Sequence, residues 1–161
     1  MSAAPSPEAT EFDDTIHATC VAADGRALLL CGPSGAGKSD LALRLIDRGA
    51  RLVSDDRTRL VRRGDHVVAS APQSIAGLIE VRGLGILPMP HLAEAPLALI
   101  LDLTNGTDAP PERYPMERTH RTLCGLPVPQ LRLAPFEAGA AIKAELALRH
   151  FGLPFRRLET A

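Results

Sequence analysis

The chain has 161 residues, of which 45% are hydrophobic and 23% are charged, and its formal net charge is −1. These values are typical of one soluble globular domain, and they argue against a nucleic-acid-binding protein and against a protein that charge holds to an anionic membrane. Four Phe, one Tyr and no Trp are also too few aromatic residues for the stacking surface of a single-strand binder.

The first residues, MSAAPSPEATEFD, are polar, acidic and rich in small residues. We expect a disordered lead-in over residues 1–13, a single domain over residues 14–155 and a short tail over residues 156–161. The start does not resemble a signal peptide, and no apolar run approaches the roughly 18 residues that span a bilayer. The three cysteines show no CxxC spacing, so we expect a reducing, cytoplasmic environment without a disulfide framework or zinc site.

Two β-compatible stretches, TIHATCV and RALLLC, flank the turn sequence Asp24-Gly25. Asp-Gly is a strong signal for a two-residue hairpin turn. In such a hairpin Ala23 pairs with Arg26, and the numbers of facing residues sum to 49. Continuing this register places His17 across from Gly32.

Beyond residues 32–39, the run SDLALRLIDRG predicts an amphipathic helix that ends before Gly49. Residues 51–54 read as a short strand that leads to Asp55 and Asp56. A hairpin over residues 58–70, turning at residues 63–65, follows. A short helix, the strand LIEV and a glycine-rich bend come next.

The apolar run of residues 96–103 predicts a strand covered on both faces. Residues 104–118 form a long polar segment, two strands lie around THRTLC and PQLRL, and a helix is expected over residues 136–151. This order of elements predicts an α/β domain with a mixed β-sheet and a C-terminal helix.

The segment CGPSGAGKS contains G-x-x-x-x-G-K-[ST], the P-loop (Walker A) pattern, between a strand and a helix, as that motif requires. The candidate phosphate-binding residues are Gly32, Pro33, Ser34, Gly35, Ala36, Gly37, Lys38 and Ser39. Backbone N–H groups of such a loop and the helix N-terminus bind phosphates. Lys38 would contact the β- and γ-phosphates and Ser39 would bind Mg²⁺, so we expect ATP and Mg²⁺ as ligands.

Phosphoryl transfer also needs a base and a carboxylate that holds the metal. Asp55-Asp56, Glu80 and Asp102 all lie in or directly after predicted strands. Asp102 follows four apolar residues, as a Walker B aspartate does, but it is equally suited to end a buried strand. The residues alone leave this choice open.

The run IHATCV, the segment GPSGAGKSDLALRLIDRGARLVSDD and the run IEVRGLGIL together resemble the catalytic domain of the HPr kinase/phosphorylase family. That family carries a histidine before a Walker A loop, an Asp-Asp pair one helix later and an ExRGxG signature. All four features occur here in order, over roughly residues 15–137. The short chain resembles the family's forms that lack the N-terminal domain.

The resemblance implies a protein-serine kinase that transfers phosphate from ATP to HPr, the phosphocarrier of a bacterial phosphotransferase system. It implies Asp56 as the catalytic carboxylate, His17 as an active-site histidine and Arg113 as a phosphate-contacting arginine. It also implies that Glu80 binds Mg²⁺ with Ser39, that Asp55 and Arg82 support the site, and that several copies assemble, as hexamers in the family.

One departure concerns dephosphorylation by phosphorolysis, which the family associates with a basic P-V-R-x-G-R segment. Residues 133–141 read LAPFEAGAA here, with a glutamate and no arginine. Phosphorolysis is therefore left open. Two other functions compete with the kinase acting on HPr: a small-molecule kinase of the nucleoside-monophosphate type, which often has the same loop sequence, and an ATP-sensing module without catalysis.

Overall fold

The computed structural model describes residues 13–103 and 119–155. In this part of the chain the strands are β1 (Asp13–Ile16), β2 (Ala18–Ala23), β3 (Arg26–Cys31), β4 (Arg51–Ser54), β5 (Thr58–Arg63), β6 (His66–Ser70), β7 (Leu78–Val81), β8 (Gly85–Pro88), β9 (Glu94–Leu103), β10 (Thr119–Leu123) and β11 (Leu126–Leu133). The helices are α1 (Lys38–Asp47), a 3₁₀ turn (Gln73–Ile75) and α2 (Ala140–Phe151). None of the described helices is long and apolar enough to cross a membrane.

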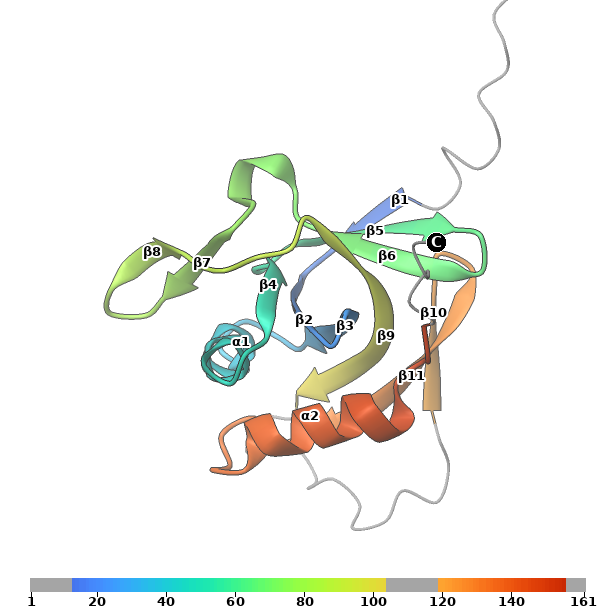
Figure 1. The fold of residues 1–161 in the computed structure, drawn as a ribbon. Helices are drawn as coiled ribbons and strands as arrows, with labels where there is room; N and C mark the ends of the chain where they lie inside the picture. The colour runs from blue at the N-terminus through green and yellow to red at the C-terminus, as the bar shows by residue number, and fades with distance from the viewer. Residues whose placement is uncertain (1–12, 104–118, 156–161) are drawn as a thin grey trace, which may run out of the picture.

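A nine-stranded mixed sheet runs β1-β5-β6-β9-β3-β2-β4, and β11 pairs with both β9 and β10. The pairs β3–β9 and β9–β11 are parallel, whereas the other pairs in this sheet are antiparallel. The first residues of β9 pair with β6, and its later residues pair with β3 and β11. Figure 1 shows β9 curving through the middle of the molecule. The predicted α/β class with a mixed sheet is confirmed.

The apolar sequence of β3 reflects burial on both faces of the sheet. Leu28 and Leu30 belong to the core cluster that packs beneath α1 and α2, whereas Leu29 and Cys31 belong to the cluster on the opposite face. Because successive side chains of a strand point to opposite faces, this strand needs apolar residues at consecutive positions. The strand therefore fixes its carboxyl end, where the glycine-rich loop begins, inside a rigid core.

Helix α1 has the predicted buried face and ends where predicted. Leu41, Ala42 and Leu45 are buried against the sheet. Gly49, with φ of 108°, follows the C-terminal cap residue, and its N–H donates to the carbonyl of Ile46 at 3.0 Å. Glycine adopts this left-handed backbone without the strain that a Cβ atom would add, which explains why the helix ends here.

The hairpin of β2 and β3 has the predicted register, from Ala23 opposite Arg26 to Ala18 opposite Cys31. However, the β-stretch predicted over residues 15–21 is two strands with His17 between them. Its first part, β1, pairs with β5. The glycine-rich bend after LIEV leads into a further strand, β8, which was not predicted.

The predicted helix over residues 136–151 is wrong in its first four residues, because α2 begins only at Ala140. Gly139 is its N-terminal cap residue, and Pro135 lies in the turn that precedes the helix. The carbonyl groups of Pro135 and Glu137 accept hydrogen bonds from Arg44 of α1, so this segment is attached to the neighbouring helix instead of continuing α2. Figure 1 shows α2 and α1 on the same side of the sheet.

Candidate functional site

The glycine-rich loop, residues 32–37, connects β3 to α1 as predicted. Gly32 allows a close approach within the loop, because a Cβ atom at this position would lie 2.9 Å from the Cβ of Ala36. Gly37, at φ of 96°, precedes the first residue of α1. The loop therefore ends at the N-terminus of a ten-residue helix, whose free N–H groups and dipole favour an anion.

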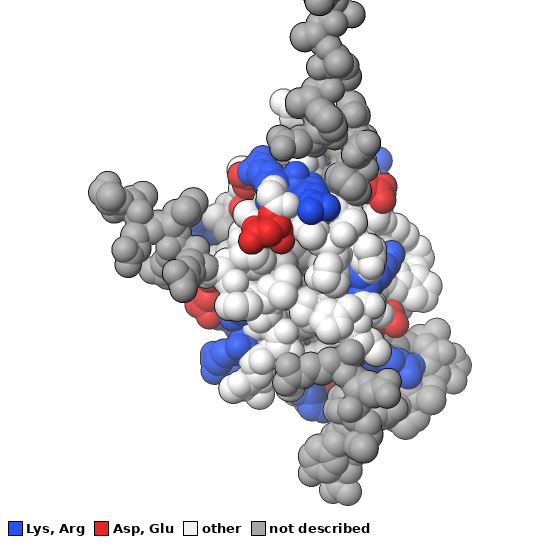
Figure 2. Space-filling model, turned by 90° about the vertical axis from the view of Figure 1, so that its right-hand side faces the viewer, with Lys and Arg blue, Asp and Glu red and all other residues white. Residues whose placement is uncertain are grey.

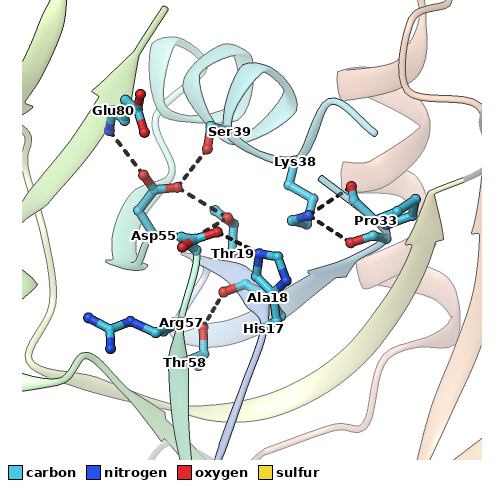
Figure 3. A network of polar contacts seen from close by, with 12 residues as sticks. His17, Ala18, Thr19, Pro33, Lys38, Ser39, Asp55, Arg57, Thr58 and Glu80 are labelled. Atoms are coloured by element: carbon cyan, nitrogen blue, oxygen red, sulfur yellow. Dashed lines mark hydrogen bonds and ion pairs between the residues drawn. The ribbon is translucent and has the colours of Figure 1, made fainter. Parts of the chain in front are cut away.

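Lys38, the first residue of α1, is only 7% exposed. Its Nζ donates to the carbonyl oxygens of Gly32 at 2.7 Å and Pro33 at 3.0 Å, so the side chain folds back over the loop (Figure 3). These partners are neutral. The ammonium group therefore keeps its net positive charge at the place where the loop would hold phosphate.

Asp55, directly after β4, is the hydrogen-bond acceptor that connects three elements of the site. Its buried carboxylate accepts hydrogen bonds from the Ser39 hydroxyl at 2.7 Å and from the Thr19 hydroxyl at 3.1 Å through Oδ1. Its Oδ2 accepts the backbone N–H of Glu80 at 3.0 Å. Three donors from three separate elements converge on this carboxylate (Figure 3), which fixes its orientation. Because the Ser39 hydroxyl is the donor in its hydrogen bond to Asp55, the lone pairs of the serine oxygen remain available to a metal.

Asp56 points the opposite way, toward solvent. Its φ of 66° is a left-handed backbone conformation, which aspartate tolerates better than most residues. The backbone N–H of Asp56 donates to the Thr19 hydroxyl oxygen at 3.1 Å, which holds this conformation. The side-chain Oδ1 lies 2.6 Å from Nε2 of His17, at the junction of β1 and β2.

The structure thus brings together His17, Ser39, Asp55 and Asp56, with Glu80 joined to them through its backbone. The Glu80 carboxylate is exposed, and Figure 3 shows it beside Asp55 and Ser39.

Two other predicted residues stand apart. Arg82 lies in the exposed turn between β7 and β8, and Arg113 lies outside the described residues. Asp102 lies opposite Cys31 in the β3–β9 pair, close to the start of the loop, but the Ser39 hydroxyl is bonded to Asp55.

Thr19 is the functional residue that sequence reasoning missed. It is fully buried in β2, and its hydroxyl donates to the Asp55 carboxylate while accepting the N–H of Asp56. A single polar residue in an otherwise apolar strand is a weak pattern. Its role becomes visible only once β2 and β4 are known to pair.

The cysteines near the site are poor nucleophiles. Burial raises the pKa of the Cys31 thiol, with Arg121 opposing the shift and Asp102 adding to it. Burial also raises the pKa of Cys20 far above its usual range. Because the thiolate is the reactive form, neither thiol is a candidate nucleophile for this site.

The donor set fits Mg²⁺ together with a phosphate. Ser39, Asp55 and Glu80 offer oxygen atoms, which are the ligands that Mg²⁺ prefers, and Mg²⁺ usually shares one or two carboxylates with substrate phosphates. Within residues 13–103 and 119–155 no group of three or more His, Cys, Asp or Glu side chains forms a metal cage.

The face of the molecule drawn in Figure 2 carries no large cluster of basic side chains. On the face drawn there, basic and acidic side chains form small separate groups with uncharged residues between them. This distribution agrees with the formal net charge of −1.

Residues 10–147 match the family model described as the HPr Serine kinase C-terminal domain. The chain is 34% identical over 149 residues to an HPr kinase/phosphorylase of Lactobacillus delbrueckii subsp. bulgaricus, covering 85% of this chain and 46% of the relative. It is 35% identical over 156 residues to an HPr kinase/phosphorylase of Burkholderia lata, covering 91% of this chain and 48% of the relative. The chain therefore spans about half the length of these curated relatives.

The fold is also similar to a solved structure. The Hpr(Ser) kinase/phosphatase from Coxiella burnetii matches with a TM-score of 0.72 and 28% sequence identity, covering 85% of this chain and 90% of that one. The similarity in three dimensions therefore covers most of both chains.

Proposed function

The chain belongs to the HPr serine kinase C-terminal domain family, and we propose that it is an ATP- and Mg²⁺-dependent protein-serine kinase acting on an HPr-like phosphocarrier protein. The observation that carries the proposal is the His17–Asp56 pair, in which Asp56 directly follows Asp55, the carboxylate that accepts the Ser39 hydrogen bond. A protein that only senses ATP needs no solvent-facing carboxylate next to the phosphate site, whereas a kinase needs one to act on the acceptor hydroxyl.

In the proposed reaction, the N–H groups of residues 32–39 and the Lys38 ammonium bind the β- and γ-phosphates. Mg²⁺, when bound, would neutralise charge on the phosphate oxygens. Asp56 accepts the proton of the acceptor serine while the serine oxygen bonds to the γ-phosphorus and the bond to ADP breaks. His17, which is hydrogen-bonded to Oδ1 of Asp56, orients this carboxylate toward the acceptor.

Residues 133–141 are the segment relevant to the reverse reaction, dephosphorylation of the phosphoserine by phosphorolysis. This stretch supplies no arginine of its own, but Arg44 of α1 reaches two of its carbonyl groups. Whether the enzyme also dephosphorylates its product is decided by adding inorganic phosphate to serine-phosphorylated HPr. Release of pyrophosphate would show phosphorolysis.

The proposed kinase is tested by transfer of label from γ-labelled ATP with Mg²⁺ to purified HPr. An HPr in which the acceptor serine is replaced by alanine is run in parallel. We expect label on normal HPr alone, and loss of label with the Asp56→Asn enzyme. Equal labelling of both HPr proteins would overturn the seryl-kinase proposal.

The competing functions give different results in the same assay. A small-molecule kinase would bind ATP, leave HPr unlabelled and transfer label to a nucleoside monophosphate. A sensing module would bind ATP, label no acceptor and keep its ATP affinity unchanged in Asp56→Asn. Each pattern would contradict the function proposed here.

A further inference from the structure

Phe136 is a phenylalanine held against the glycine-rich loop while most of it stays in contact with solvent. A Cβ atom built on Gly37 would lie 3.0 Å from both Cε1 and Cζ of Phe136, so the edge of the ring touches the loop at the start of α1. The residue is nevertheless 65% exposed. Single exposed hydrophobic residues are common on protein surfaces, so the informative feature is that this ring touches the glycine-rich loop.

The backbone on both sides of Phe136 is fixed. Arg44 of α1 donates to the carbonyl oxygens of Pro135 and Glu137, the two residues that flank the phenylalanine. The Glu137 carboxylate also pairs with Lys143 of α2 at 2.6 Å. The ring is thus presented by a segment anchored to both helices, and its ordering costs little when a ligand arrives.

The sheet topology places Phe136 where a ligand would extend from the loop. Strands β3, β9 and β11 are parallel, so their carboxyl ends lie at the same edge of the sheet. The glycine-rich loop follows β3, and the segment with Phe136 follows β11. Ligands of α/β sheets bind outside the carboxyl ends of such strands.

The other described phenylalanines lie elsewhere. Phe155 packs edge-on against His66, with ring centroids 5.6 Å apart. Phe151 lies at the last residue of α2 and lines a separate cavity of about 260 Å³ with His120 and His150. Among residues 13–103 and 119–155, Phe136 is therefore the phenylalanine placed at the loop.

We propose that the Phe136 ring is the platform on which the base of the bound nucleotide stacks. This inference rests on the proposed function, because it takes the loop as the site of the triphosphate. The base is a flat aromatic group at the end of the ligand opposite to the γ-phosphate. Stacking on an aromatic side chain recognises its π-face and does not depend on hydrogen bonding.

The test separates the base from the phosphates by comparing ATP with inorganic tripolyphosphate. Each is titrated with Mg²⁺ present into the full 161-residue chain, by calorimetry. We expect Phe136→Ala to weaken ATP binding about tenfold and to leave tripolyphosphate binding unchanged. Phe151→Ala, a partly exposed phenylalanine away from the loop, should change neither.

A second variant gives a direct optical readout. The chain contains no tryptophan, so Phe136→Trp introduces a single one. We expect ATP to quench its fluorescence and tripolyphosphate to leave it nearly unchanged, whereas Phe151→Trp should respond to neither ligand.

Several outcomes would overturn the stacking proposal. Equal weakening of both ligands in Phe136→Ala would make the ring a structural support of the loop. Unchanged ATP binding with a raised KM for HPr would make it a contact for the acceptor protein. A wild-type chain that binds neither ATP nor tripolyphosphate would instead refute the nucleotide-binding function itself.

Discussion

The imidazole Nε2 of His17 lies 2.6 Å from the carboxylate Oδ1 of Asp56, although 39 positions separate the two residues in the chain. His17 lies just before β2, and Asp56 follows β4, the strand that pairs with β2. The His17 side chain is 50% exposed and that of Asp56 is 64% exposed. The pair is thus built by the sheet and open to an acceptor from solvent.

The pair predicts non-additive kinetics, because His17 acts through Asp56. We expect Asp56→Asn to lower kcat by about 10²- to 10⁴-fold, the usual contribution of a general base. His17→Ala should lower it less, and the double variant should resemble Asp56→Asn alone. Initial rates with γ-labelled ATP and HPr measure all three. Effects that multiply would show that His17 acts independently of Asp56.

Thr19 predicts a loss of both stability and turnover. Thr19→Val keeps the shape but leaves the Asp56 N–H without its partner and removes one donor from Asp55, so we expect a loss of about 1–3 kcal/mol in the free energy of unfolding. Urea denaturation measures this loss, and Thr19→Ser should restore most of it.

A matched control separates positioning from stability. Thr58 is also fully buried, and its hydroxyl donates to the Ala18 carbonyl at 2.9 Å. Thr58→Val should destabilise the fold without lowering kcat in the folded enzyme. If Thr19→Val lost no more activity than Thr58→Val, Thr19 would be structural only.

Two of the candidate metal carboxylates, Asp55 and Asp102, predict a different dependence of ATP binding on Mg²⁺. Asp55 is bonded to Ser39, so Asp55→Asn should raise the Mg²⁺ concentration needed for half-maximal ATP binding. Asp102→Asn should raise this Mg²⁺ concentration less. Asp102 lies opposite Cys31 in the β3–β9 pair, whereas the Ser39 hydroxyl is hydrogen-bonded to Asp55. Nucleotide binding titrated at increasing Mg²⁺ checks the order. A larger effect of Asp102→Asn would instead identify Asp102 as the metal-binding carboxylate, as its Walker B-like sequence pattern allows.

Thiol labelling follows from the raised pKa values of two cysteines. Burial raises the pKa of both Cys20 and Cys31, so at neutral pH their thiols are protonated and also inaccessible. Cys124 is only partly buried. Iodoacetamide should therefore modify Cys124 first, and Cys20 only after unfolding, as followed by mass spectrometry of peptides. Rapid labelling of Cys20 in the native protein would contradict this burial.

Local patterns predicted the parts of the fold that depend on near neighbours. The Asp24-Gly25 turn fixed the β2–β3 register, and the spacing of Leu41, Ala42 and Leu45 fixed the buried face of α1. The alternatives that the residues left open depend on distant pairing. Ser39 bonds to Asp55 because β4 lies beside β2, and no local pattern shows this neighbourhood.

The same reason explains what was missed. The division of residues 13–23 into two strands follows from the pairing of β1 with β5, far along the chain. The two hydrogen bonds of Thr19 could not be predicted before the positions of Asp55 and Asp56 relative to β2 were known. The late start of α2 depends on Arg44, which lies on another helix. Each is a tertiary interaction that overrides a local preference.

The turn at Asp24-Gly25 also limits how this gene can change in length. It connects the strand that follows His17 to the strand that ends at the loop, so its two residues set how far the histidine lies along the hairpin. One inserted codon would shift that register by about 3.3 Å and reverse the side on which each following residue points. The turn between β5 and β6 bears no such relation to the site. Insertions and deletions should therefore accumulate there during evolution, while the β2–β3 hairpin keeps its length.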